Sequence, residues 1–251
     1  EEEKRMHSGV GRIAPMRMRT MSLWESKESN GKVSLASLFE GDADVAAISD
    51  LTIEGLAYAT CRGGWPASTK LKEKAALRVA RNYVEEVINY DVHRVDGVDK
   101  NTTRVRKLLE SYARNISTMA ANETIMADVR ATDQTISPNT FAIYLSALRR
   151  IFIVDDVPAW SPALRSKTKI RTSPKRHFVD PSIAVALMGT NPQGLLKDFP
   201  TFGFLFEDLC ARDLRVYAQA LDGEVYHYRD KNELECDLVV ALRDGRWGAV
   251  E

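Results

Sequence analysis

Three acidic residues near the C-terminal end have the types and spacing of a metal-binding site. Glu207 lies in a stretch of helical pattern, whereas Asp237 and Glu251 lie in two strand-like runs on either side of a turn at Asp244-Gly245. Two carboxylates at neighbouring positions of a hairpin can share a divalent cation, because hard oxygen ligands suit Mg²⁺. A cation held there would polarise a phosphate and activate water. The alternative is that the acids are solvated and carry no chemistry.

A cluster of basic residues forms the second candidate site. Its members are Arg165, Lys167, Lys169, Arg171, Lys175 and Arg176, with no acidic residue among them. In a loop between two paired strands they would pass close to DNA phosphates, and each phosphate neutralised would add to a salt-dependent affinity. Arg149 and Arg150, at the end of the preceding predicted helix, extend this DNA-binding surface. The alternative is an ordinary solvated loop.

The order of elements over residues 101–180 is that of a winged helix. Ser137-Pro138 is a strong helix start, with a capping residue followed by proline at the first helical position. A strand is predicted over Ile151–Val154 because its residues are β-branched or aromatic, and His177–Val179 is the returning strand. The buried faces of the first and last helices are predicted to carry Val105, Leu108, Leu109, Tyr112 and Ile116, then Phe141, Tyr144, Leu145 and Leu148. Asn122 is placed to cap the short helix between them.

Helices are also predicted upstream of this region. Asp50 can cap a helix over residues 51–61, and Gly63-Gly64-Trp65-Pro66 ends it. A longer helix is predicted from Ser68. Before these helices, residues 16–19 alternate methionine and arginine, which is typical of an edge strand with solvated arginines.

The last seventy residues have the pattern of a small α/β unit. A helix is predicted around Gly203–Ala211, and three strands over Leu214–Ala218, Glu235–Ala241 and Trp247–Glu251. The fold class predicted for the whole chain is therefore α/β and helix-rich, with a helical region and a winged helix before the α/β unit.

Composition limits the partners and the compartment. The 251 residues hold 35 Lys and Arg against 35 Asp and Glu, so net charge alone points to no partner. The three cysteines lie far apart without a Cys/His cluster, which argues against a zinc site and favours a reducing, cytoplasmic environment. No apolar run approaches the roughly 20 residues that span a bilayer, so no membrane partner is expected. The sequence contains no GxxxxGK[ST] loop, and we expect the chain alone to bind ATP poorly.

Two N-terminal stretches carry a resemblance to a known group of proteins. His7–Ile13, with its Gly-Arg pair, and Met18–Ser26 resemble the end of the ATPase core in prokaryotic AAA+-type ATPases. Arg62–Pro66 is similar to a turn of that group. The resemblance implies that Arg12 lies near a nucleotide in the intact parent protein, where ATP would be the cofactor. It also implies that the ATP-binding part precedes this chain.

The C-terminal part resembles the domain of unknown function that follows those ATPase cores. The matching stretches are Ser173–Asp180, Gly203–Glu207, Tyr228–Lys231, Glu235–Val239 and Val250-Glu251. The last segment is similar to the PD-(D/E)XK nuclease superfamily, with a restriction-endonuclease-like fold. This implies that Glu207 is the helix acid, Asp237 a metal ligand and Glu251 the acid of the E-x-K element, with Mg²⁺ as the cofactor.

The lysine of that element would fall two residues after Glu251. We therefore expect the chain to be truncated within a strand and to show little or no cleavage.

The expected organisation has four parts. Residues 1–33 end the ATPase core, 34–100 form a helical lid, 101–180 form the winged helix and 181–251 the nuclease-like unit. Three functions stay open at this point: a DNA-associated ATPase fragment with a metal-dependent nuclease-like unit, a non-catalytic module that binds DNA or protein, and a homo-oligomerisation unit.

Overall fold

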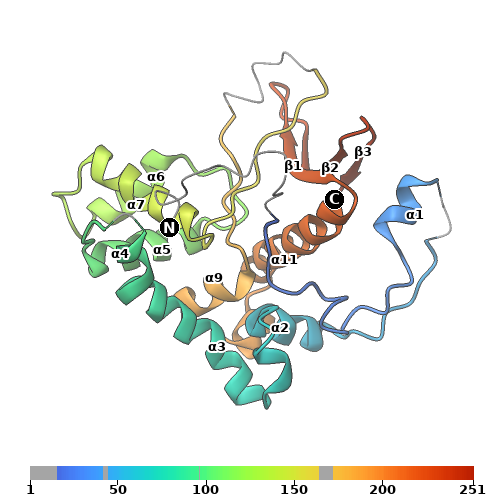
Figure 1. Cartoon of the computed structure of the whole chain (residues 1–251), viewed down its shortest axis with the longest axis horizontal. Helices are drawn as coiled ribbons and strands as arrows, with labels where there is room; N and C mark the ends of the chain where they lie inside the picture. The colour runs from blue at the N-terminus through green and yellow to red at the C-terminus, as the bar shows by residue number, and fades with distance from the viewer. Residues whose placement is uncertain (1–15, 42–44, 96, 164–171) are drawn as a thin grey trace, which may run out of the picture.

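The computed structural model describes residues 16–41, 45–95, 97–163 and 172–251, and these form a helix-rich α/β fold (Figure 1). The helices are α1 (Leu35–Phe39), α2 (Ile53–Arg62), a 3₁₀ turn η2 (Ser68–Lys70), α3 (Glu73–Glu86), a π-helical turn η3 (Val87–Asp91), α4 (Val92–Arg94), α5 (Thr102–Arg114), α6 (Asn122–Arg130), α7 (Pro138–Arg150), α9 (Pro181–Met188), α10 (Pro192–Lys197) and α11 (Phe199–Ala220). The strands β1 (Gly223–Arg229), β2 (Glu235–Leu242) and β3 (Trp247–Val250) form an antiparallel sheet in that order. The predicted helix-rich α/β class is confirmed.

The N-cap of α2 is not the residue that we predicted. Thr52, rather than Asp50, is the N-cap, because its hydroxyl accepts a hydrogen bond from the Gly55 amide at 3.1 Å. The predicted helix end is confirmed, since Gly63 has φ 72° and terminates α2. A left-handed backbone of this kind favours glycine.

The long helix predicted from Ser68 begins later than expected. Only a 3₁₀ turn starts there, and the Ser68 hydroxyl donates back to the Trp65 carbonyl at 2.7 Å instead of capping a helix. Leu71 is extended, and α3 begins at Glu73. The apolar spacing was therefore sufficient to predict the helix and insufficient to locate its first turn.

Helices α5, α6 and α7 enclose the main hydrophobic core together with α2, α3 and α9. The apolar faces predicted for α5 and α7 are confirmed as buried. Ser137 caps α7 as predicted, by accepting from the Thr140 amide. Asn122 does not cap α6, whose N-cap is Ala121. The side-chain oxygen of Asn122 instead accepts a hydrogen bond from the Arg176 guanidinium at 3.0 Å, so this amide makes a tertiary contact.

The two segments predicted as strands on either side of the wing form no regular strands, but isolated antiparallel bridges join them. Backbone bonds join Val179 N to Ile153 O at 3.0 Å and Asp155 N to His177 O at 2.9 Å, and bridges form at Val154–Phe178 and Val157–Lys175. We predicted that the first segment starts at residue 151. Its pairing starts at residue 153 instead, because Ile151 caps α7 and Phe152 has φ 60°.

Helix α11 is 22 residues long and covers the sheet (Figure 1). The strand predicted over Leu214–Ala218 is wrong, because these residues are the last turns of α11. Ala211 and Ala218 pack against Leu238 and Val240 of the sheet, and this burial overrides the strand preference of the local sequence. The strands predicted near Glu235–Ala241 and Trp247–Glu251 are confirmed as β2 and β3, whereas β1 was not predicted.

Residues 16–19 do not form the predicted edge strand, and their arginines are not simply solvated. Arg17 and Arg19 contact the Asp155 carboxylate at 2.7 and 3.2 Å. The chain then runs beside α11 and the end of α2 before it reaches α1 (Figure 1). This N-terminal segment is fixed by bonds to three distant residues, Asp155, Gly64 and Asp213.

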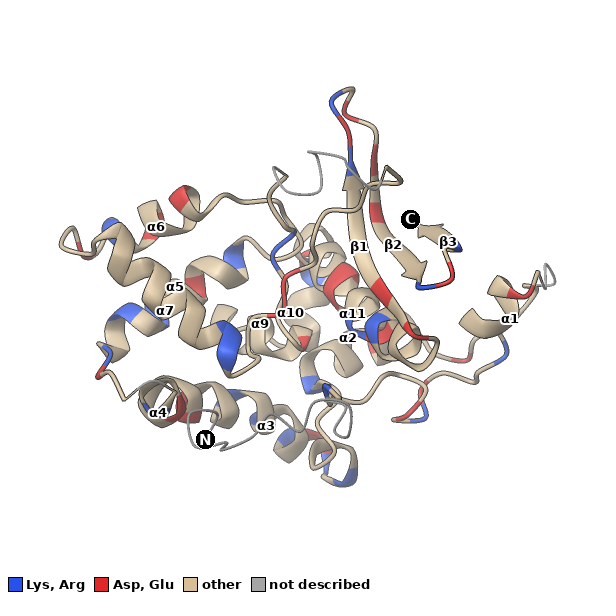
Figure 2. Ribbon diagram, turned by 45° about the horizontal axis from the view of Figure 1, so that its top comes forward, with Lys and Arg blue, Asp and Glu red and all other residues tan. Residues whose placement is uncertain are grey.

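Charges of both signs alternate along the helices and the β1–β2 hairpin and do not separate onto opposite sides (Figure 2). Among the described helices, none is both long and apolar enough to cross a bilayer.

Candidate functional site

The three predicted acids lie around one pocket. Glu207 on α11, Asp237 on β2 and Glu251 after β3 all line a hollow of about 500 Å³ between the helix and the edge of the sheet. Leu238 pairs with Val250, and continuing this antiparallel register by one residue sets Asp237 opposite Glu251. The remaining wall is apolar and consists mainly of residues from the first turns of α11.

A β-bulge aims Asp237 into this pocket. Tyr226 pairs with Val239 and Tyr228 with Cys236, so two residues of β2, Asp237 and Leu238, face only His227 of β1. Without the bulge, Asp237 and Leu238 would alternate to opposite faces of the sheet. A bulge bends the strand and reorients the extra side chain, and here both residues line the pocket beside α11.

A lysine that the sequence placed in the basic wing reaches into the acid pocket. The Nζ atom of Lys175 lies 2.7 Å from an oxygen of Glu207 and 2.7 Å from one of Asp237. Its backbone is held by two bonds to Val157, at 2.9 and 3.0 Å. Sequence reasoning missed this contact because Lys175 is 32 residues from Glu207 and 62 from Asp237.

Burial and charge shift the ionisation of the pocket residues. Burial raises the pKa of Glu207 to about 7, and the negative charge of Asp237 adds to this, while the Lys175 ammonium opposes it. The hydrogen bonds to Asp237 and Glu207 outweigh burial and raise the pKa of Lys175. Burial also raises the pKa of the adjacent Cys210 thiol to about 12, so this cysteine is not an activated nucleophile.

The donor set of the pocket suits a hard cation. Asp237 and Glu251 would hold a Mg²⁺ ion through carboxylate oxygens, and Glu207 would approach from the helix. Within the described residues, no group of three or more His, Cys, Asp or Glu side chains is already arranged as a metal site. The cation beside Glu207 and Asp237 is instead the Lys175 ammonium group.

His227, which faces the bulge, is fully buried. Its Nε2 donates to the Ser173 carbonyl at 3.1 Å, and its Nδ1 has no hydrogen-bond partner among the described residues. Burial lowers the pKa of His227, and the positive charge of Lys175 adds to this effect; together they bring the pKa to about 4. The imidazole is therefore neutral at neutral pH.

Acid should destabilise the protein through His227. The unfolded histidine binds a proton near pH 6.5 and the folded one only near pH 4, so this contribution to stability is lost as pH falls between these values, by about 3 kcal/mol in all. His227→Gln keeps a donor for the Ser173 carbonyl and removes the titration. Urea unfolding at a series of pH values should give a flatter profile for H227Q than for the wild type. Equal profiles for H227Q and wild type would contradict this account.

The predicted DNA-binding residues fall into three groups. Arg165, Lys167, Lys169 and Arg171 lie outside the described residues, as does Arg12. Lys175 and Arg176 are buried and used internally: Arg176 donates to the Ala120 carbonyl and to Asp156, at 2.8 and 3.2 Å. Arg149 and Arg150 lie at the exposed end of α7, where Arg149 also pairs with Asp156 at 2.8 Å.

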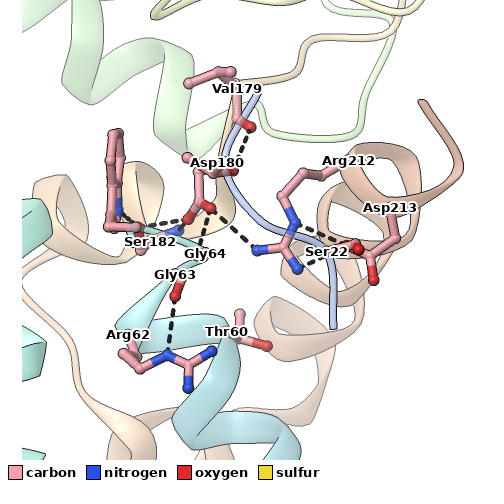
Figure 3. A network of polar contacts seen from close by, with 12 residues as sticks. Ser22, Thr60, Arg62, Gly63, Gly64, Val179, Asp180, Ser182, Arg212 and Asp213 are labelled. Carbon is pink, nitrogen blue, oxygen red and sulfur yellow. Dashed lines mark hydrogen bonds and ion pairs between the residues drawn. The ribbon is translucent and has the colours of Figure 1, made fainter. Parts of the chain in front are cut away.

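A buried ionic network ties the site to the N-terminal segment (Figure 3). Arg212 of α11 donates from Nη1 to Asp180 at 3.1 Å and from Nε to Asp213 at 2.8 Å. Asp180 accepts from the Gly64 amide, and Asp213 from the Leu23 amide, both at 2.9 Å. These bonds hold the turn after α2, the start of α9 and the N-terminal segment against the helix that carries Glu207. No pattern in the sequence predicts this network, because its members come from four separate stretches.

Comparisons with known families give two matches along the chain. Residues 202–251, which include all three acids, match a domain of unknown function, DUF4143, which is often found alongside AAA ATPases. Residues 53–194, from the start of α2 into α10, match another domain of unknown function, DUF8612. No curated protein and no solved structure matches the chain. Because the second of these domain models covers more than half of the 251 residues, the chain belongs to the DUF8612 family.

Proposed function

We propose that this chain is the C-terminal part of an AAA+-type ATPase that acts on DNA, with a winged helix over residues 101–180 and a nuclease-like α/β unit over residues 181–251. The observation that carries the proposal is the convergence of Glu207, Asp237 and Glu251 on one pocket beside the sheet. A helix acid and two acids on adjacent strands are the arrangement of PD-(D/E)XK nucleases, which the C-terminal sequence resembles.

Two further findings support the proposal. The C-terminal match is to a domain that often accompanies AAA ATPases. In addition, α5, α6 and α7 are followed by two segments that antiparallel bridges join, one on either side of the basic stretch of sequence, which is the element order of a winged helix. ATP would belong to the parent protein, since the sequence has no phosphate-binding loop. The cytoplasm is the compartment that we propose, because all three cysteines are free thiols.

The pocket residues would have separate roles toward a phosphodiester. A Mg²⁺ ion, when bound by Asp237 and Glu251, would polarise the phosphate and activate water. Glu207, whose pKa is raised to about 7, can hold or release a proton near neutral pH beside that position. The apolar wall from α11 would limit access of bulk water.

The position of Lys175 favours a second candidate function, a non-catalytic module. Its ammonium contacts two of the three acids and offsets one of their negative charges, so the pocket already holds a counter-ion without a metal. The chain would then bind DNA or a protein partner, or form a homo-oligomer, without cleavage.

The experiment that separates the two candidates is metal binding by the full chain. Calorimetric titration with Mn²⁺, which binds the same oxygen ligands as Mg²⁺, should show one site that Asp237→Asn and Glu251→Gln each weaken by tenfold or more. Asp230→Asn, in the exposed β1–β2 turn, is the matched control and should have no effect. If no site is detected, only the non-catalytic module remains.

DNA binding should depend on the exposed end of α7. Arg150→Ala should weaken binding of a short labelled duplex and reduce the slope of log affinity against log salt by about 1, because one phosphate contact is lost. Fluorescence anisotropy at several salt concentrations measures both quantities. Arg78→Ala, at an exposed arginine on α3, should change neither. An unchanged slope for R150A would remove α7 from the DNA-binding surface.

A further inference from the structure

The carboxylate pocket contains a cation that is part of the chain itself. The Lys175 side chain is 10% exposed and its Nζ bridges Glu207 and Asp237, with both distances 2.7 Å. Charge-assisted hydrogen bonds of this length are strong, and they use the Asp237 carboxylate that the proposed metal would need. The ammonium group and a metal ion would therefore meet at the same ligand.

We infer that Lys175 is a tethered cation that competes with a divalent metal ion for the carboxylate pocket, so that the metal enters only as the lysine leaves. The inference rests on the proposed function in one respect, that Asp237 and Glu251 are the metal ligands. It adds a built-in control of metal occupancy, which comes from outside the C-terminal unit.

Electrostatics makes joint occupancy unfavourable. A divalent ion bound to Asp237 would lie only a few ångströms from the Lys175 ammonium, in a pocket where two of the charged groups are largely shielded from water. At that distance and degree of burial, salt in the solvent screens the repulsion only weakly. When all three carboxylates are ionised, they and Lys175 together carry a net charge of two negatives, whereas the carboxylates alone carry three.

The exchange requires no opening of the backbone. Lys175 is fixed by its backbone bonds to Val157, but its four-carbon stem has several rotatable bonds and a compact charge at the end. A rotamer change can therefore withdraw the ammonium while the strand pair stays intact.

The test is the Mn²⁺ affinity of the full 251-residue chain, measured by calorimetry for the wild type, Lys175→Met and Lys197→Gln. Methionine keeps the length of the side chain and removes the charge. We expect K175M to bind Mn²⁺ at least tenfold more tightly than the wild type, and K197Q, at an exposed lysine on α10, to match the wild type. Adding Asp237→Asn to K175M should abolish the gain, which places the ion in the pocket.

A second variant covers the case in which K175M fails to fold because Glu207 is left unpaired. The double variant K175M/E207Q removes both partners of that ion pair and retains Asp237 and Glu251, and it should also bind Mn²⁺ more tightly than the wild type. Equal affinity of the wild type and the Lys175 variants would overturn the competition and leave the metal site standing. Absence of binding in every variant would overturn both the competition and the metal site of the proposed function.

Discussion

Replacing Arg212 by alanine should destabilise the protein by about 3–5 kcal/mol, because two buried carboxylates would lose their counter-charge. The Arg212 side chain is 1% exposed, and Asp180 is fully buried. Burial opposes ionisation of Asp180, yet Arg212 and the hydrogen bonds from Ser182 and Gly64 keep its pKa below the usual value. Without Arg212, the Asp180 carboxylate must stay charged without a partner or take up a proton. Urea unfolding followed by circular dichroism measures the loss.

The matched control is Arg243→Ala at the surface. Arg243 contacts Asp222 at 3.0 Å, and both side chains are about three-quarters exposed. A solvated pair of this kind contributes less than about 1 kcal/mol. If R212A and R243A lower the free energy of unfolding by similar amounts, the buried network in Figure 3 stabilises the fold no more than a surface ion pair does.

The second large effect is expected at Gly64, where a methyl group has no space. A Cβ atom at this position would overlap the carbonyl oxygen of Met21 and lie 2.7 Å from the Met21 amide nitrogen. The same two residues share a backbone bond, from Met21 N to Gly64 O at 2.7 Å. Gly64→Ala should therefore push the N-terminal segment away from the turn after α2, at a cost of about 3 kcal/mol.

Limited proteolysis gives a direct readout of this displacement. Cleavage at Arg19 and Lys27 should be faster in G64A than in the wild type, together with the loss in unfolding free energy. Gly203→Ala is the control: a Cβ there meets no atom within 4 Å, and the residue lies within α11. Alanine should stabilise that helix by about 0.5–1 kcal/mol. Wild-type proteolysis rates for G64A would show that the segment is not held at this turn.

Local signals in the sequence were enough for most helices and for two of the three acids of the pocket. Ser137-Pro138 predicted the start of α7, because a cap and a proline act within one turn. Asp237 and Glu251 could be brought together from a turn and two strand patterns, because a hairpin fixes which residues face each other. The convergence of Glu207 with them came from the resemblance to a nuclease family, and spacing alone would not have supplied it.

The errors arose where contacts distant in sequence decide the structure. Residues 214–218 have the composition of a strand, but packing of α11 on the sheet keeps them helical. Lys175 and Arg176 are predicted from the sequence to contact DNA, whereas both are buried against partners from other elements. A run of positive charge in a sequence does not show which members are neutralised within the fold.

The extended segment over residues 153–160 changes partner along its length. It pairs in antiparallel fashion with the chain around Lys175 up to Val157, and two residues later Ala159 pairs in parallel with His227. Side chains alternate between faces along such a segment, so deleting or inserting one residue near Pro158 would reverse every side chain beyond it relative to the bulge. Evolution can therefore exchange residue types here far more freely than it can alter the number of residues. We expect gaps in related sequences to fall in the loop before Lys175 and to avoid residues 153–160.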